Sequence, residues 1–409
     1  MTTWKTRAMG ALLAGGVALG TGAARAGIDP LSYHDQELTV AGVARQVRVV
    51  NGYRLEVLTT GLDAPRLPIF GSGGELLIGS RSGRVYRLLP PYREPEVLLT
   101  LSGYPHSVAV REGELLIAAT DGLYRAPYHP GQTRIDPGTV IRLAPLPGGR
   151  GHSSRSVARG PDGRVYLSLG IAGNCSDQYL GPGYSFDDQR GGILVLKEGG
   201  GKPGWEPFAS GLRNPVGFSW HPVTGELYAT NNGPDHLGFD QPPEYFSRVP
   251  PGSFHGMPWF QFDGARVHRD DCVASPPPRP LAHVLPPVAT FPSRNAPLGM
   301  AFVPLEVMGP LAGDAVVALH GSWGTAPGGS YWGSAASRRP PKLVAVRFVE
   351  GKAVRTDDLV TGFQLPDGER WARPAGVAVG SDGSVYFTSD DATEGVFRLT
   401  TVTADPKKE

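Results

Sequence analysis

The 409-residue chain lacks several features that mark common classes of protein. It has two cysteines, and neither lies in a C-x-x-C-H motif, which excludes a covalently attached c-type haem. It has no EF-hand pattern and no cysteine–histidine spacing of the zinc-binding kind. After the first 26 residues no apolar period of 3.6 residues is sustained, which argues against an α-helical architecture.

An excess of charge of one sign is also missing. Lys and Arg together number 39, and Asp and Glu together number 38. This balance gives no sign of a nucleic-acid partner or of a basic surface that binds membranes. We therefore expect neither kind of partner.

The N-terminus has the pattern of an export signal. Lys5 and Arg7 precede an uncharged, mostly apolar run at 8–19, and Ala24-Arg25-Ala26 fits the cleavage pattern. The run is too short and too rich in glycine to span a membrane. We expect a signal peptide at 1–26, export to the periplasm or the medium, and a single mature domain at 27–409. Cleavage removes three basic residues and no acidic one, which leaves a net charge of −2.

The two cysteines, Cys175 and Cys272, both lie in polar, turn-rich segments. An exported protein can keep a disulfide, so the sequence favours a bond between them. The distance between the two Cα atoms decides whether the bond can form, and the sequence does not contain that distance.

Glycine (57 residues) and proline (40 residues) are abundant, and short runs of β-type residues recur between them. Six runs follow a glycine-containing turn, with turn glycines at Gly74, Gly113, Gly163, Gly225, Gly313 and Gly383. A blade of four strands needs about 40–50 residues, so this spacing predicts an all-β fold, a six-bladed β-propeller. A large β-sandwich or a two-domain β protein is the alternative.

Two long segments interrupt the repeats, one from Phe239 to Pro286 and one from Trp323 to Pro341. Loops of this length inside a compact domain are usually functional or disordered. On a propeller we expect them to cap one mouth of the channel. The proline-rich stretch from Ser275 to Pro280 is equally typical of a stiff spacer.

Polar residues at the ends of predicted strands are candidates for chemistry. His152 lies in a loop before a strand and is a candidate general base, or simply a surface histidine. Arg213 and Asn214 precede Pro215, which favours extended backbone at Asn214. The planar Arg213 side chain suits a carboxylate ligand, or a structural acid of the protein itself.

A turn at Gly233-Pro234-Asp235 is a candidate metal loop. Ca²⁺ takes oxygen ligands, including backbone carbonyls, and Asp240 and Glu244 supply further carboxylates nearby. An ordinary β-turn is the alternative.

Three other side chains are candidates for contact with a planar or anionic ligand. Trp323 follows His320-Gly-Ser and could stack on such a ligand or fill the core. Arg373, before the last repeat, and Lys342, at the start of a predicted strand, offer two more cationic groups, each of which could also be structural.

The order of these motifs resembles the soluble quinoprotein glucose/sorbosone dehydrogenase family, especially its sorbosone-dehydrogenase-like branch. The resemblance covers about Leu55 to Leu399 and depends on the His152 loop with Gly160-Pro-Asp-Gly163, and on Gly211-Leu-Arg-Asn-Pro-Val-Gly217, Asn232-Gly-Pro-Asp235, Ala296-Pro-Leu-Gly299 and His320-Gly-Ser-Trp323. It implies a six-bladed propeller that binds pyrroloquinoline quinone (PQQ) over its channel, with Ca²⁺ polarising the quinone.

The resemblance also assigns roles to single residues. His152 matches the base, and Arg213 with Asn214 matches a cofactor contact. Gly233 and Pro234 match the loop that offers carbonyl oxygens to Ca²⁺, with Asp235 beside them. The cationic groups around the cofactor correspond to Lys342 and Arg373.

Three positions depart from the glucose-oxidising members of the family. Gly151 stands where those members usually have an acid, Gly170-Ile171 stands where they commonly have Gly-Asp, and 239–244 replaces an acidic pair. These departures argue against glucose specificity.

Three functions from different classes are compatible with the sequence. The first is a PQQ- and Ca²⁺-dependent dehydrogenase of a sugar or a related alcohol or aldehyde. Such an enzyme would pass its electrons to a separate acceptor, a cytochrome or the quinone pool. The second is a Ca²⁺-dependent, lactonase-like propeller hydrolase, and the third is a non-catalytic ligand-binding propeller.

Overall fold

The computed structural model describes residues 29–149, 151–199, 201–307 and 309–402. The chain divides into two units, Met1–Pro30 and Leu31–Glu409. The predicted signal peptide at 1–26 therefore lies outside the described residues. Within the described ranges, no helix is long and apolar enough to cross a membrane.

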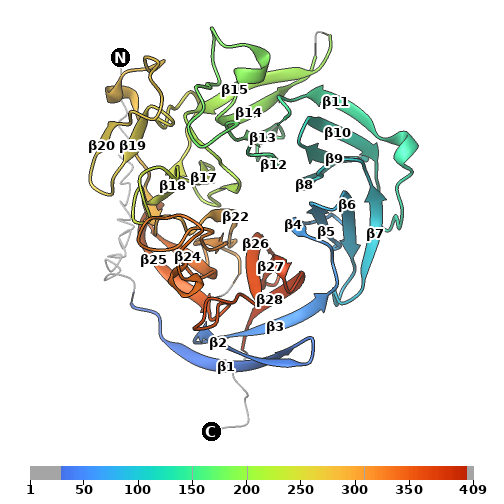
Figure 1. Cartoon of the computed structure of the whole chain (residues 1–409). Helices are drawn as coiled ribbons and strands as arrows, with labels where there is room; N and C mark the ends of the chain where they lie inside the picture. Colours follow the sequence, from blue (N-terminus) through green and yellow to red (C-terminus); the bar gives the residue numbers. More distant parts are fainter. Residues whose placement is uncertain (1–28, 150, 200, 308, 403–409) are drawn as a thin grey trace, which may run out of the picture. The chain divides into compact units, whose positions relative to one another are not determined.

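The second unit contains six antiparallel sheets of four strands or more, arranged around a common centre (Figure 1). Each sheet is one blade, and each blade is numbered here in chain order. Blade 1 consists of β4 (Pro65–Phe70), β5 (Leu76–Ser80), β6 (Arg84–Leu88) and β7 (Pro95–Thr100). Blade 2 consists of β8 (Ser107–Arg111), β9 (Glu114–Ala119), β10 (Gly122–Pro127) and β11 (Ile141–Pro145). Blade 3 consists of β12 (Arg155–Arg159), β13 (Val165–Leu169), β14 (Gly192–Lys197) and β15 (Gly204–Ser210).

The remaining blades follow the same plan, with additions. Blade 4 consists of β16 (Phe218–Trp220), β17 (Leu227–Asn231), β18 (Glu244–Arg248) and β21 (Ala289–Phe291). Blade 5 consists of β22 (Pro297–Phe302), β23 (Ala315–Leu319), β24 (Lys342–Val349) and β25 (Lys352–Thr361), extended by β2 (Val43–Val50) and β1 (Tyr33–Val40). Blade 6 consists of β26 (Ala372–Val379), β27 (Val385–Ala392), β28 (Gly395–Thr401) and β3 (Tyr53–Thr60). The predicted all-β, six-bladed propeller is confirmed.

An N-terminal strand closes the ring. β3 is the outermost strand of blade 6 and pairs with β28, with Leu55 opposite Leu399. The two ends of the propeller are thus held together by backbone hydrogen bonds, so the ring has no open end between its first and last blades.

The six predicted turn glycines all lie between the first and second strands of a blade. Their φ angles are positive, between 66° at Gly225 and 83° at Gly313. Residues with a Cβ rarely adopt this conformation, which explains why glycine recurs at the same place in every repeat. The repeat in the sequence therefore marks one particular turn of each blade.

The core lies between the blades, where the faces of neighbouring sheets pack together. One cluster joins blades 2 and 3 and includes Leu116, Leu167 and Leu194, of which the first two are completely buried. Aliphatic side chains suit this packing because each sheet is covered on both faces.

Segments outside the blades carry the rest of the secondary structure. A small hairpin of β19 (Phe260–Phe262) and β20 (Val267–Arg269) lies in the connection from β18 to β21. Four short 3-10 helices lie in connections, at Pro137–Thr139, Phe186–Asp188, Leu281–His283 and Ala335–Ser337. Cys175 and Cys272 form a disulfide with a Cα–Cα distance of 5.7 Å, which joins the β13–β14 loop to the loop after β20.

Candidate functional site

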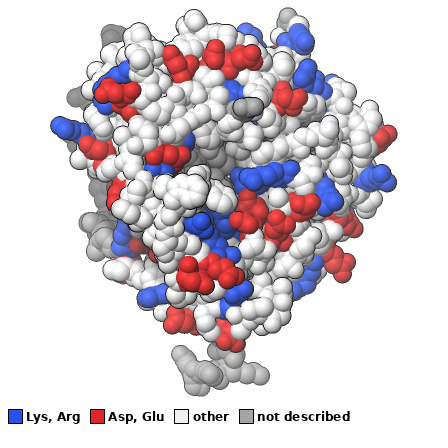
Figure 2. All heavy atoms as spheres, in the orientation of Figure 1, with Lys and Arg blue, Asp and Glu red and all other residues white. Residues whose placement is uncertain are grey.

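A cavity of about 640 Å³, open on one side, lies where the first strands of the blades begin. Figure 2 shows a hollow on this face, with basic and acidic side chains close to it. The wall is built from the segments before the first strands and from the turns between the second and third strands. These two kinds of segment meet at one face because successive strands of a blade run in opposite directions. The charged and imidazole side chains of the wall are Arg66, Arg81, His152, Arg213, Asp235, Glu244, Arg294, His320, Arg373, Asp390, Asp391 and Glu394.

Seven of the residues that the sequence singled out line this one cavity. They are His152, Arg213, Asn214, Gly233, Asp235, Trp323 and Arg373. They come from blades 3 to 6 and from the loops that join them, so the propeller brings together segments that lie more than 200 residues apart in the sequence.

His152 lies in the loop between β11 and β12, where one contact orients its ring and another holds its backbone. Its Nδ1 lies 2.7 Å from the Ile171 carbonyl oxygen, which can only accept, so Nδ1 carries the proton and Nε2 has the lone pair. Arg155 donates a 2.7 Å hydrogen bond to the carbonyl oxygen of His152. Burial and the positive charge of Arg213 lower the pKa of His152 to about 3, so the imidazole is neutral at neutral pH.

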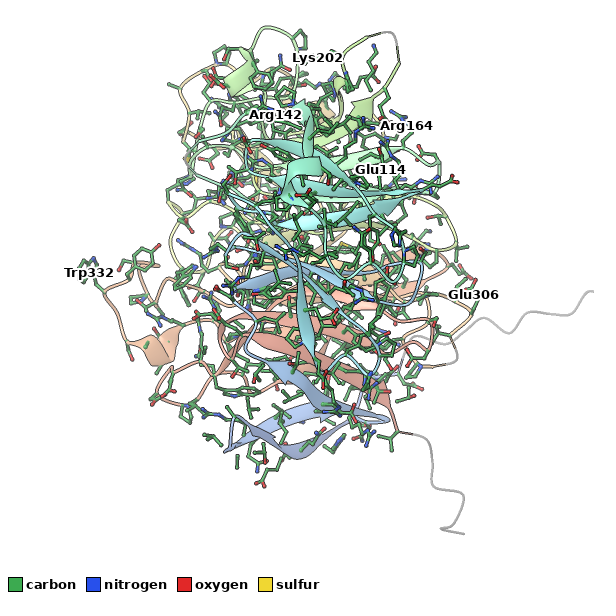
Figure 3. All side chains as sticks on the ribbon, turned by 90° about the vertical axis from the view of Figure 1, so that its right-hand side faces the viewer. Glu114, Arg142, Arg164, Lys202, Glu306 and Trp332 are labelled. Carbon is green, nitrogen blue, oxygen red and sulfur yellow. A yellow bond between two sulfur atoms is a disulfide. The ribbon has the colours of Figure 1, made fainter. Side chains whose placement is uncertain are left out.

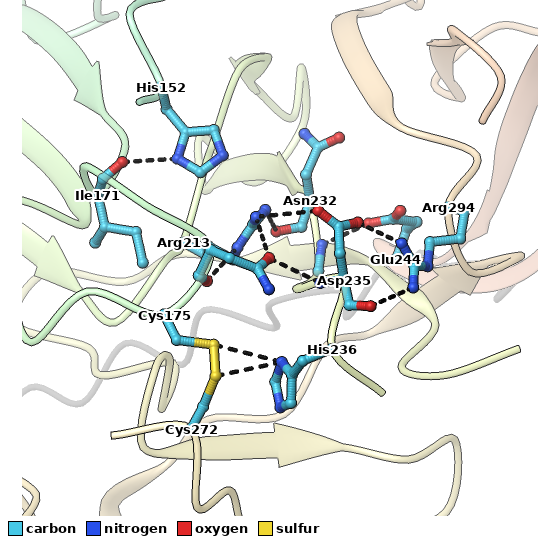
Figure 4. A network of polar contacts seen from close by, with 12 residues as sticks. His152, Ile171, Cys175, Arg213, Asn232, Asp235, His236, Glu244, Cys272 and Arg294 are labelled. Carbon is cyan, nitrogen blue, oxygen red and sulfur yellow. Dashed lines mark hydrogen bonds and ion pairs between the residues drawn. A yellow bond between two sulfur atoms is a disulfide. The ribbon is translucent and has the colours of Figure 1, made fainter. Parts of the chain in front are cut away.

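Arg213 precedes β16 and is 5% exposed. Its Nε and Nη2 donate to the backbone and side-chain oxygens of Asn174, both at 2.8 Å, and Nη1 donates to the Asn232 carbonyl oxygen at 3.2 Å (Figure 4). The carboxylate of Asp235 is farther away, at 3.9 Å. Burial lowers the pKa of Arg213. The guanidinium is thus held rigidly by neutral oxygens, with its charge only partly compensated.

Asn214 holds the neighbouring loop through its backbone. Its N–H donates to Asn231 Oδ1 at 2.9 Å, and its carbonyl oxygen accepts from Asn232 Nδ2 at 3.2 Å. The Asn214 side-chain oxygen lies beside Gly170, where an added Cβ would meet it at 2.8 Å. Glycine at position 170 therefore lets this loop lie close to the His152 loop.

The loop at 233–235 lies between β17 and β18. The buried Glu244 accepts a 2.6 Å hydrogen bond from the Gly233 N–H. Burial raises the pKa of Glu244 to about 7, although the Gly233 contact partly opposes this effect. Within the described residues, the carbonyl oxygens of Gly233 and Pro234 accept no hydrogen bond. Neither oxygen therefore has a donor among the described residues.

The predicted ligand Asp235 has a different partner. Its Oδ1 forms an ion pair with Arg294 Nη1 at 2.6 Å. Its N–H donates a hydrogen bond to Asn174 Oδ1 at 2.8 Å. Asp235 lines the cavity, but its carboxylate already compensates a buried arginine. The Pro234 ring is buried, and Pro234 is not part of the cavity wall.

Lys342 is a predicted cofactor contact that does not line the cavity. Lys342 begins β24, the third strand of blade 5 from the centre, and its Nζ forms a 2.6 Å ion pair with Asp358 on β25. It does not contribute to the cavity wall. Arg294, in the loop before β22, supplies a cation that the sequence analysis missed.

A second histidine has both ring nitrogens occupied. His320 Nδ1 accepts from Arg373 Nη2 at 2.8 Å, and its Nε2 lies 2.6 Å from Asp390 Oδ1. Burial lowers the pKa of His320 to about 4. Burial alone would raise the pKa of Asp390, but His320 and Arg66 outweigh it and hold that pKa far below its usual range. His320 is therefore a structural group that positions Arg373, whereas His152 Nε2 has no hydrogen-bond partner among the described residues.

Arg373 and Trp323 form the next part of the wall. The guanidinium carbon of Arg373 lies 4.1 Å from the centre of the Trp323 ring, a cation–π contact. Trp323 is 53% exposed, so the opposite face of its ring remains accessible. Farther along the same loop, Tyr331 and Trp332 are 70% and 94% exposed, and Trp332 projects from the molecule (Figure 3).

Backbone strain gathers at this site. Ala64, Arg294 and Ala296 have φ angles of 44°, 69° and 49°, and all three line the cavity. Such conformations cost about 1–3 kcal/mol each and typically occur where the surrounding structure positions functional groups.

The sequence contains a signal that points to the missed arginines. In three blades an arginine lies within two residues of a proline that is in or just before the first strand: Pro65-Arg66, Arg213-Asn-Pro215 and Arg373-Pro374. An arginine next to this proline lies at the start of a central strand and therefore at the cavity. Arg294 has no such marker, because it belongs to a loop whose path is set by its contact with Asp235.

The fold and the site together define a class: a six-bladed propeller with an arginine-rich central cavity and a neutral histidine at its wall. A family model described as glucose/sorbosone dehydrogenase matches residues 124–322. This match confirms the predicted resemblance and supports an oxidoreductase that acts on sugars. The sorbosone-like branch stays a prediction.

Comparison with solved structures agrees with the propeller fold. A protein of Borreliella burgdorferi described as uncharacterized is 23% identical over 387 residues, which cover 88% of this chain and 93% of that protein. A Trichoderma reesei member of carbohydrate-active enzyme family AA12 superimposes with a TM-score of 0.73 at 18% identity over 87% of this chain and 97% of that chain. The PQQ domain of a pyranose dehydrogenase from Coprinopsis cinerea gives a TM-score of 0.68 at 20% identity, again over 87% and 97%.

Proposed function

We propose that the chain is a PQQ-dependent dehydrogenase that oxidises a sugar or a related alcohol or aldehyde, with Ca²⁺ as a second cofactor. The observation that carries this proposal is the state of His152. Its ring is neutral, its Nδ1 is bound to Ile171, and its Nε2 lone pair is free at the wall of a cavity rich in arginine. A base next to an anion site is what oxidation of a hydroxyl group by an anionic cofactor requires.

The charges of the cavity fit PQQ, which carries three carboxylates. Five arginines line the wall: Arg66, Arg81, Arg213, Arg294 and Arg373. Arg213 forms hydrogen bonds only to neutral oxygens, and the buried Nε of Arg66 has no partner among the described residues. A buried guanidinium whose charge is only partly compensated, as at Arg213, favours an anionic ligand.

The loop at 233–235 fits Ca²⁺ through its backbone. Among the described residues no donor bonds to the carbonyl oxygens of Gly233 and Pro234, and Glu244 accepts from the Gly233 N–H. Oxygen ligands of this kind suit a hard cation. Asp235 is a weaker candidate ligand because Arg294 holds its carboxylate.

Each residue of the site would then have a separate role in the reaction. When bound, PQQ supplies a hydride acceptor, and Ca²⁺ supplies a positive charge that polarises its quinone oxygen. His152 Nε2 takes the proton of the substrate hydroxyl, and the Ile171 carbonyl stabilises the imidazolium that results. Arg213 and Arg373 orient the carboxylates, and the exposed face of Trp323 packs against a planar ring.

Export and electron transfer complete the proposal. The signal-like segment at 1–26 supports a periplasmic or secreted enzyme. Because the chain has no c-type haem motif, the reduced cofactor would pass its electrons to a separate acceptor, a cytochrome or the quinone pool.

The acidic residues of the cavity favour this function over a lactonase-like hydrolase. A hydrolase that uses Ca²⁺ alone would need several free carboxylates from different blades. Here Asp235, Asp390 and Asp391 each form an ion pair with an arginine.

Titration of the purified protein with PQQ, with and without Ca²⁺, tests the proposal. We expect stoichiometric PQQ binding, and dye reduction that depends on an aldose or alcohol substrate. His152→Asn should bind PQQ normally and lower kcat by about 10²–10⁴, the usual contribution of a general base. His283→Asn, at an exposed site, is the matched control and should keep full activity.

Three results would overturn the proposal. Failure to bind PQQ in the presence of Ca²⁺ would exclude PQQ as the cofactor. Lactone or ester cleavage without the quinone would instead establish the hydrolase, and ligand binding without either reaction would establish a binding propeller.

A further inference from the structure

A histidine contacts both sulfurs of the disulfide outside the cofactor cavity. His236 Nδ1 lies 3.4 Å from Cys175 Sγ and 3.3 Å from Cys272 Sγ (Figure 4). The three residues come from three separate segments: the β13–β14 loop, the β17–β18 loop and the loop after β20. Two sulfurs and one imidazole nitrogen thus converge on one point.

Asp270 sets the orientation of this histidine. Its Oδ1 lies 2.9 Å from His236 Nε2, and the Asp270 side chain is 3% exposed. Since a carboxylate accepts the Nε2 proton, the neutral ring presents the lone pair of Nδ1 to the two sulfurs. Carboxylates that hold the distal nitrogen of a histidine in this way are common behind metal ligands.

We propose that the reduced form of the Cys175–Cys272 pair binds a borderline or soft metal ion of the Zn²⁺ class through both cysteine sulfurs and His236 Nδ1. Tetrahedral Zn²⁺ with bonds of about 2.3 Å to sulfur and about 2.1 Å to nitrogen places neighbouring sulfur and nitrogen ligands about 3.5 Å apart. The two nitrogen–sulfur distances in the structure already lie close to this value.

The reaction balances with a dithiol or a phosphine as reductant. The reductant supplies two electrons, the sulfur–sulfur bond breaks, and each sulfur takes one proton from solvent or from the dithiol. Metal binding then releases both thiol protons and forms two metal–sulfur bonds and one metal–nitrogen bond. The sulfurs must separate to about 3.8 Å in tetrahedral geometry, which side-chain rotation can provide.

Backbone contacts hold the three ligands in place when the disulfide is open. Beside Cys175, Asn174 accepts from Arg213 and from the Asp235 N–H, both at 2.8 Å. The Cys272 N–H donates to Asp270 Oδ1 at 2.9 Å, and the Asp270 N–H donates to the Trp259 carbonyl oxygen at 2.8 Å. Reduction therefore leaves the ligands close together.

The site is open to solvent on one side. The His236 side chain is 29% exposed, and both cysteines are partly exposed. A reductant and a metal ion can therefore reach it, and water can supply a fourth ligand. Because Asn174 and Asp235 adjoin Cys175 and His236, this metal site borders the loops that hold Arg213.

Metal titration of the full chain, reduced with a phosphine under anaerobic conditions, tests the proposal. Ca²⁺ in excess keeps the loop at 233–235 occupied, so that Zn²⁺ does not bind there. A chromophoric chelator reports Zn²⁺ binding. We expect one tightly bound Zn²⁺ per reduced chain and none per oxidised chain. With Co²⁺, the reduced protein should show the near-ultraviolet band of thiolate-to-metal charge transfer, which a site without sulfur ligands cannot produce.

Single substitutions distinguish the proposed metal ligands from neighbouring residues that do not bind the metal. His236→Gln should weaken Zn²⁺ binding at least tenfold, and Asp270→Asn should weaken it by about 10–100-fold. His268→Gln, in the nearby β20, is the matched control and should bind Zn²⁺ as the wild type does. The proposal is wrong if reduced and oxidised chains bind equally, if His236→Gln changes nothing, or if circular dichroism shows that the disulfide opens only on unfolding.

Discussion

Acidification should destabilise the wild-type protein more than a His152→Asn variant, because the folded chain holds this imidazole neutral. Burial and the charge of Arg213 lower the pKa of His152 to about 3, against about 6.5 in an unfolded chain. Between these values the unfolded state binds the additional proton, so the free energy of unfolding falls as the pH falls below 6.5. Asparagine does not titrate, and its amide can still donate to the Ile171 carbonyl.

The magnitude follows from the two pKa values. One proton of difference changes the free energy of unfolding by about 1.4 kcal/mol per pH unit, so a decrease to pH 5 costs the wild type at most about 2 kcal/mol through His152. Other buried histidines, such as His255 and His320, add their own losses. These losses are common to both proteins and cancel in the comparison.

Urea unfolding of cofactor-free and metal-free protein at pH 7 and pH 5 measures this difference. The wild type should lose about 2 kcal/mol more than His152→Asn between the two values. His283→Asn, on the exposed 3-10 helix Leu281–His283, controls for removal of a histidine from the surface and should lose as much as the wild type. Equal losses in the wild type and His152→Asn would refute the assignment of a neutral imidazole.

Three further outcomes are expected. Arg213→Lys should weaken PQQ binding about tenfold or more in equilibrium titration, because the loss of one charge-assisted hydrogen bond costs about 1.5 kcal/mol or more; unchanged affinity would show that Arg213 does not contact the cofactor. Chelation should abolish dye reduction and readdition of Ca²⁺ should restore it, whereas full activity in chelator would exclude the ion. Leu167→Ala should cost about 2–5 kcal/mol in urea unfolding, because Leu167 is completely buried between blades 2 and 3.

Much of the architecture was predictable because the repeat has a local cause. The turn between the first and second strands requires a positive φ, and glycine meets this requirement wherever it occurs. Counting these turns therefore counts the blades. The same regularity explains why His152, Arg213 and Gly233 could be placed at one face, since each lies next to a strand end that the repeat identifies.

Lys342, unlike Arg373, does not line the cavity, and the reason lies in the fold. First strands lie nearest the common centre, so a cation at the start of a first strand is closer to the cavity than one at the start of a third strand. Arg373 is the second residue of β26, a first strand, whereas Lys342 begins β24, a third strand, and pairs with Asp358. The sequence pattern of the two strand starts is alike, so it could not separate them.

The sequence by itself determined the β-propeller class, the number of blades and the loops that carry His152, Arg213 and Gly233. These features follow from local rules of turn and strand formation, which act over a few residues. Only the tertiary structure decided the partners and charge states: His320 with Asp390, Asp235 with Arg294, and the lowered pKa of His152. Such properties depend on burial and on charges brought together from different blades, and distance along the chain does not encode either.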